Sequence, residues 1–112
     1  MQCVDMKSSH FLQAKNIIRE RAREDISVRD VADAVGISSS LLYRIFAQNG
    51  LSPLSYLLVC RIDMARQQLL DDPNRSVAMV AQDCGFHDSA YFCKVFRRQV
   101  GMTPNGYRQR FL

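Results

Sequence analysis

The chain has 112 residues, and 15 basic against 11 acidic side chains give it a net charge of +4 at pH 7. This length suffices for one small domain or two very small units, and 47% hydrophobic with 23% charged residues excludes a disordered tail. Most of the basic residues are arginine, whose planar guanidinium donates paired hydrogen bonds to phosphate or guanine. We therefore expect an acidic partner, with nucleic acid as the first choice and an anionic membrane as the second.

Membrane insertion and export are not expected from the sequence. No run of eighteen apolar residues is present, and residues 1–10 lack the charged-then-apolar order of a signal peptide, which favours a cytoplasmic location. The cysteines form no CxxC pair and are expected to be free or buried thiols: Cys3, Cys60, Cys84 and Cys93.

A motif of about 50 residues occurs twice. Residues 27–37 match residues 76–86 at an offset of 49 in one Ser, two Val, one Ala and one Gly position. Later segments match at offsets of 50 and then 51, because turns absorb insertions while helices keep their spacing. Two copies are too few for a solenoid, so the pattern indicates a duplicated motif within one small protein.

Each copy predicts a helix, a tight turn and a second helix. Ser27 is expected to cap the first helix, with Asp30 in a weaker form of the capping box. Gly36 suits a left-handed turn, and Ser38 caps the second helix. Apolar positions at helical spacing are expected to face the core: Val28, Val31, Ala32, Val35, Leu41, Leu42, Ile45 and Phe46, and in the second copy Val77, Val80, Ala81, Cys84, Tyr91, Phe92, Val95 and Phe96. In the second copy Ser76 and Asp88 are the expected helix caps, and Gly85 is the expected turn residue.

Three further helices complete an all-α architecture of about seven helices. Ser52 and Pro53 predict the start of a linker helix, roughly 27 Å long at ~1.5 Å per residue, and Ser9 and Thr103 are expected to cap the first and last helices. The inward stripe of the linker is Leu54, Leu58, Ile62, Ala65 and Leu69. We divide the chain into a tail (1–8), a first helix-turn-helix subdomain (9–51), the linker helix (52–70) and a second helix-turn-helix subdomain (71–112).

The second copy carries a longer signature that resembles a known family. Its pattern is Ala81-x3-Gly85-Phe86-x-Asp88-x2-Tyr91-Phe92-x-Lys94-x-Phe96-Arg97-x3-Gly101-x-Thr103-Pro104-x2-Tyr107-Arg108, and the linker adds Arg61-x3-Ala65-x3-Leu69-Leu70. This is similar to the AraC/XylS family of bacterial transcription regulators, over roughly residues 9 to 111. The chain departs from many members in one place, since three residues rather than four separate Phe46 from Gly50, which predicts a tighter exit from that helix.

The resemblance implies a sequence-specific regulator that binds double-stranded DNA, most often as an activator. It implies two recognition helices in successive major grooves, which are about 34 Å apart. We expect the domain to bind DNA as a monomer, RNA polymerase to be a further partner, and no cofactor to be needed.

Candidate contact residues lie on the outer faces of the two second helices and at their entrances. The outward pattern gives Ser39, Ser40, Tyr43, Arg44 and Ala47 or Gln48 in the first copy, and His87, Asp88, Ser89, Ala90, Cys93, Lys94 and Arg97 in the second. The resemblance points to Ser40, Tyr43 and Arg44 as base contacts, with phosphate contact as the alternative for Arg44. Phosphate contacts are expected at two helix N-termini and two arginines: Ser27, Ser76, Arg75 and Arg98. Arg61 is expected to tie the linker to a neighbouring turn.

Three other functions fit the sequence less well than DNA binding. Cys84, His87 and Cys93 offer three ligands without finger-like spacing, so no metal site is expected. No paired carboxylates, phosphate loop or Ser/His/Asp set indicates an enzyme. A helical protein-interaction module is the stronger rival, but it predicts apolar outer faces, whereas these faces are polar and cationic apart from Tyr43 and Ala90.

Overall fold

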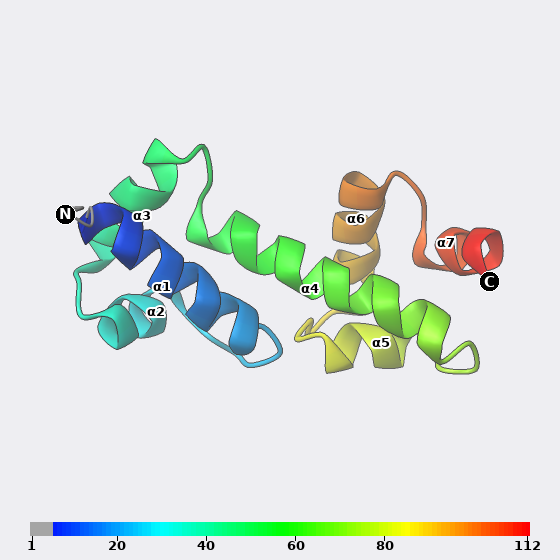
Figure 1. Ribbon diagram of the computed structural model, residues 1–112. Coiled ribbons are helices and arrows are strands. Elements are labelled where there is room, and N and C mark those ends of the chain that lie inside the picture. Colours follow the sequence, from blue (N-terminus) through cyan, green and yellow to red (C-terminus); the bar gives the residue numbers. More distant parts are fainter. Residues whose placement is uncertain (1–5) are drawn as a thin grey trace. The chain divides into compact units, whose positions relative to one another are not determined.

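A computed structural model describes residues 6–112, with side chains from Ser9 onward, and shows seven α-helices in this range (Figure 1). The prediction of an all-α fold is confirmed, and no strand occurs in residues 6–112. The helices are α1 (Met6–Glu20), α2 (Val28–Val35), α3 (Ser39–Gln48), α4 (Pro53–Asp71), α5 (Val77–Asp83), α6 (Ser89–Val100) and α7 (Pro104–Phe111).

The predicted caps begin five of these helices. The Ser27 hydroxyl accepts from the backbone N–H of Asp30 at 3.1 Å, and the Asp30 carboxylate accepts from the N–H of Ser27 at 3.0 Å, which completes a capping box. The remaining caps satisfy one N–H each in α3, α5, α6 and α7: Ser38, Ser76, Asp88 and Thr103. At the start of α4, the hydroxyl groups of Ser52 and Ser55 each accept from the other residue's N–H.

The prediction that Ser9 caps the first helix is wrong. Helix α1 already begins at Met6, so Ser9 lies inside it and its hydroxyl accepts from the Gln13 amide at 3.3 Å. Ser is a preferred N-cap residue, but Ser8 and Ser9 both lie inside the helix, so the cap preference placed the start too late. Part of the expected tail, residues 6–8, is therefore helical, while Cys3 lies outside the described residues.

The contacts divide the chain into two compact units, and the boundary falls inside α4 between Leu57 and Leu58. The first unit contains α1, α2, α3 and the start of α4. Phe46 is fully buried and packs edge-on against Phe11, with ring centroids 5.0 Å apart. The side chains buried with it are Ala14, Ile18, Ala22, Ile26, Val31, Ala32, Leu42, Ile45 and Leu57.

The second unit contains the rest of α4 with α5, α6 and α7. Its core has a run of aromatic contacts, in which Phe92 touches Phe86 and Phe96, and Phe96 touches Tyr107. Helix α4 contributes Leu58, Ile62, Ala65 and Leu69 to this core, and α5 contributes Val80 and Ala81. Cys84, aligned with Val35 of the first copy, is also fully buried, as its apolar position predicted.

Two residues expected in the core are largely exposed. Leu54 is 55% exposed because α4 buries Pro53, Leu57 and Cys60 near its start, so its inner stripe is rotated there. Tyr91 is 44% exposed, and its ring only leans on Phe86 at 6.1 Å between centroids. Both corrections concern helix ends, where the helical period leaves the choice of face open.

Glycines make the turn inside each helix-turn-helix possible. Gly36 has φ +87° and Gly85 has φ +94°, in the left-handed region that side chains with a Cβ rarely adopt. This confirms the predicted position of both turns. The first turn leaves three residues between its helices and the second leaves five. Gly36 faces open space, whereas Gly85 is buried.

Candidate nucleic-acid interface

The outer face of α3 is set by what its inner face buries. Leu42, Ile45 and Phe46 are at most 1% exposed, so the residues between them point away from the core. Ser40, Tyr43, Arg44, Ala47 and Gln48 are exposed, while Ser39 is half-buried at the helix start. The structure therefore brings the predicted contacts of the first copy onto one helix.

Arg44 is available to a partner. Within residues 6–112 its side chain makes no hydrogen bond or ion pair, and Ser40 lies one helical turn before it on the same face. Tyr43 is 51% exposed, and its hydroxyl group has no partner within the same range. A guanidinium, a phenol and a hydroxymethyl group on adjacent turns can read base edges or grip phosphates.

Helix α6 presents the corresponding face in the second unit. Phe92, Val95 and Phe96 are fully buried, and the residues that point outward are Ser89, Ala90, Lys94 and Arg97, with His87 and Asp88 exposed at the entrance. Cys93 differs from the other candidates, because it is half-buried and packs against the core. The small Ser89 and Ala90 side chains leave room for close approach of a base pair.

The cations of α6 outnumber its acidic groups. Lys94, Arg97 and Arg98 are exposed and make no ion pair with any residue from 6 to 112. Asp88 is the acidic residue at the other end of the helix, and its carboxylate accepts from the N–H of Ala90 at 2.9 Å. Asp88 is thus engaged as the helix cap, and the exposed charge along α6 is positive.

The two helix N-termini proposed as phosphate contacts differ. At α2, hydrogen bonds from the Ser27 backbone and hydroxyl hold the pKa of Asp30 below its ordinary value, so a carboxylate occupies this N-terminus at neutral pH. At α5, Met79 takes the place of Asp30, and the first turn has no acidic residue. The N-terminus at Ser76 is therefore the more favourable of the two for an anion.

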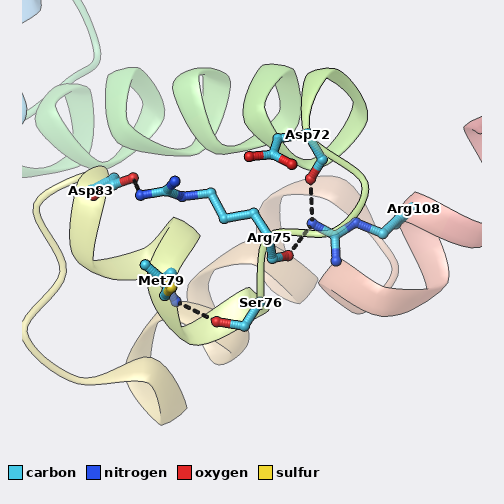
Figure 2. Close-up of polar contacts among 6 residues, drawn as sticks. All are labelled: Asp72, Arg75, Ser76, Met79, Asp83 and Arg108. Atoms are coloured by element: carbon cyan, nitrogen blue, oxygen red, sulfur yellow. Dashed lines mark hydrogen bonds and ion pairs between the residues drawn. The ribbon is translucent and has the colours of Figure 1, made fainter.

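Arg75 and Arg108 form a cluster that the sequence did not predict. Figure 2 shows the Arg75 guanidinium paired with the Asp83 carboxylate, so this predicted phosphate contact is engaged inside the second unit. Arg108 donates to three backbone carbonyl oxygens, those of Leu69 at 3.0 Å, Asp72 at 3.4 Å and Arg75 at 2.7 Å. The α7 side chain thus satisfies the end of α4 and the turn that leads to α5.

Two arginines of α4 stack on aromatic rings. Arg61 lies over Phe86, 5.8 Å from the ring centroid, which confirms that it ties the linker helix to the turn between α5 and α6. Arg66 lies over Tyr107, and the hydrogen bond to the Tyr107 hydroxyl raises the pKa of Arg66 above its ordinary value. These two cations stabilise the second unit, unlike Lys94, Arg97 and Arg98 of α6, which are exposed and make no ion pair within residues 6–112.

The residues 6–112 hold no cluster of three or more His, Cys, Asp or Glu side chains that fits a metal ion. Cys84 is fully buried among apolar side chains. In the same range no helix is long and apolar enough to cross a membrane.

Two cationic second helices in a duplicated helix-turn-helix define a DNA-binding domain of transcription regulators. A family model described as "Helix-turn-helix domain" matches residues 31–110, and the chain belongs to this family, in its AraC/XylS branch, as the sequence signature predicted. The uncharacterized regulator YpdC of Escherichia coli is 38% identical over 97 residues, which cover 86% of this chain and 34% of YpdC. The Msm operon regulatory protein of Streptococcus mutans is 35% identical, covering 87% of this chain and 35% of that protein.

Solved structures agree with this assignment. An AraC-type regulator from Chromobacterium violaceum superimposes with a TM-score of 0.84 at 29% identity, covering 94% of both chains. The DNA-binding domain of AdpA, solved with a target DNA, gives a TM-score of 0.77 at 29% identity, covering 90% of this chain and 91% of that one. The chain spans about a third of the length of the curated relatives it matches.

Proposed function

We propose that this chain acts as the DNA-reading part of a bacterial transcriptional activator, with α3 and α6 each entering a major groove. The observation that carries the proposal is the presence on both helices of exposed cations that form no ion pair within residues 6–112: Arg44 on α3, and Lys94 and Arg97 on α6. A relative from Rhodococcus is named a transcriptional activator, which supports activation rather than repression. The chromosome and RNA polymerase would be its partners in the cytoplasm.

The base contacts are proposed at Ser40, Tyr43 and Arg44 in the first unit and at Ser89, Ala90 and Lys94 in the second. The two sets differ chemically, so the two half-sites should differ in sequence and the whole site should not be a palindrome. The remaining proposed contacts at the rim or entrance of these helices are Ser39, Gln48, His87, Asp88, Cys93 and Arg97, with Ser27, Ser76 and Arg98 on phosphates.

The proposal is tested by binding to a site selected from a random DNA pool. If about six phosphates are neutralised, log K should fall with log salt at a slope near −5 (~0.9 per phosphate). Arg44→Ala should cost about 1–3 kcal/mol on the selected site and relax one base position. Arg23→Ala, in the exposed turn after α1, is the matched control and should leave the sequence preference unchanged. Salt-independent affinity, or an unchanged base preference in Arg44→Ala, would contradict the proposal.

The use of both helices by one chain has its own test. Helix α4 runs unbroken from Pro53 to Asp71 and contributes residues to both units. Insertion of ~5 bp between the half-sites turns the second one by about half a helical turn of DNA. Specific affinity should then fall to that of one motif, whereas equal affinities would mean that only one helix reads bases.

A further inference from the structure

The first unit contains an apolar hollow behind the outer face of α3. Its volume is about 270 Å³, and its walls come from α1, the segment before α2, α2 itself, α3 and the start of α4. Ile18, Val31 and Leu57 form buried parts of the wall, while the half-exposed Leu54 and Tyr43 also line it. The hollow is thus open to solvent and bordered by all four helices of this unit.

The chemistry of the walls selects against charge. None of the lining side chains is ionisable at neutral pH, and the polar side-chain groups are the hydroxyls of Ser27 and Tyr43. The Ser27 hydroxyl accepts from the Asp30 N–H and also hydrogen-bonds to the Asp30 carboxylate, so it is engaged within the capping box. The Tyr43 hydroxyl has no partner within residues 6–112. A charged ligand would lose its hydration here without an ion partner, whereas one hydroxyl group on a ligand finds a partner.

The volume sets the size of the occupant. An apolar cavity of about 150 Å³ holds benzene, and sites for drug-sized ligands begin at about 300 Å³. We propose that this hollow binds a small neutral molecule of about ten non-hydrogen atoms, apolar except for one hydroxyl group. The molecule lies between α2, α3 and the start of α4, with its hydroxyl group toward Tyr43.

Occupancy of the hollow is coupled to DNA binding, and this part rests on the function proposed above. Tyr43 is both a wall of the hollow and a proposed base contact, so a bound molecule restricts the position of its ring. Any resulting change in DNA affinity is matched by an equal change in affinity for the small molecule, because coupling between two sites is reciprocal.

The binding experiment uses 2-phenylethanol as the neutral probe and phenylacetate as its charged counterpart. Methyl signals are followed by NMR in the whole chain during titration. We expect saturable shifts with 2-phenylethanol, concentrated on the methyl groups of Ile18, Val31 and Leu57, and at least tenfold weaker binding of phenylacetate. Shifts that do not saturate, that spread over both units, or that are equal for the two probes would overturn the proposal.

Two tryptophan variants separate the hollow from general surface binding. Leu54→Trp fills the mouth and should weaken the neutral probe at least tenfold, while Val59→Trp, also on exposed α4 surface but outside the hollow, should bind as the unmodified chain does. Equal binding by both variants would overturn the assigned position.

The coupling to DNA is tested separately. Selected DNA is titrated with and without saturating probe, and we expect a change in the Kd for DNA of threefold or more. If the probe binds but the Kd for DNA is unchanged, only the coupling is rejected. If the chain fails to bind DNA in the absence of probe, only the proposed function is rejected.

Discussion

The two units follow the same sequence pattern but complete their cores in different ways. The second unit joins Phe86, Phe92, Phe96 and Tyr107 in a run of ring contacts and adds arginine side chains around it. In the first unit Phe46 contacts the rings of Phe11 and Tyr56, and the unit keeps a hollow of about 270 Å³ beside α3. Residues 58–112 also carry eight basic against five acidic side chains, while residues 1–57 carry seven against six.

This difference shows that a count of cations overstates the number available to DNA. Of the basic residues in the second unit, Arg61 and Arg66 stack on rings, Arg75 pairs with Asp83, and Arg108 binds backbone carbonyls. In the first unit Arg44 projects from α3 without such a role. The excess charge of the second unit therefore contributes to folding as well as to attraction of DNA.

The largest expected effect concerns the two turn glycines. Gly85→Val should destabilise the second unit by about 2–3 kcal/mol, because it combines left-handed strain with a buried position. Gly36→Val has the same strain, but its Cβ meets open space, so about 1 kcal/mol is expected in the first unit. Urea unfolding followed by NMR signals of each unit measures both costs. Equal losses would show that burial at Gly85 adds nothing.

The next effect concerns the arginine contacts to carbonyl oxygens. Arg108→Met keeps the aliphatic stem but leaves the carbonyls of Leu69 and Arg75 without their donor, and should cost about 2 kcal/mol in the second unit. Arg110→Met is the matched control on the same helix, and its exposed side chain predicts a change within about 0.5 kcal/mol. The free energy of unfolding is measured for both variants. Similar losses of stability in the two variants would contradict a structural role for Arg108.

A smaller effect separates phosphate contacts from structural cations. Arg98→Ala should weaken all DNA sequences about equally and reduce the salt slope by about 1, since Arg98 is exposed and unpaired within residues 6–112. Arg75→Ala should leave the salt slope unchanged, because its guanidinium pairs with Asp83. Binding titrations at several salt concentrations give the salt slope of each variant. A reduced slope for Arg75→Ala would indicate that Arg75 contacts phosphate after all.

The smallest effect is the pH dependence of the first unit. The pKa of Asp30 is lowered in the folded chain, so its contribution to stability is present above the ordinary carboxyl pKa and is lost as pH falls through the folded value. Carboxyl NMR titration should give a midpoint below that of an unfolded aspartate. Asp30→Asn should flatten the acid limb of the stability curve, and an unchanged curve would mean that the capping box contributes nothing.

The sequence predicts the helices and caps well because these depend on neighbouring residues. Ser27, Gly36 and Asp88 could be assigned from the pattern alone, and the structure confirms all three. The failures at Leu54 and Tyr91 arise where tertiary packing selects the buried face at a helix end. The role of Arg108 could not be derived from spacing, since its acceptors lie 33 to 39 positions earlier. The exposed faces of α3 and α6 could be predicted from the apolar positions on their buried faces. Which of the exposed side chains contact DNA depends on the DNA itself, so the sequence pattern alone does not determine it.

The bonds of Arg108 also determine when the second unit can be completed during synthesis. Its acceptor at Leu69 leaves the ribosome 39 residues before the arginine that binds it, an interval of about 2–8 s at ~5–20 residues per second. Until then, water or non-native donors must satisfy the end of α4. The first unit has all its helices in the first 57 residues and can fold during that interval. The nascent chain should therefore gain its two helix-turn-helix units in order, the one that carries Arg44 before the one that carries Lys94.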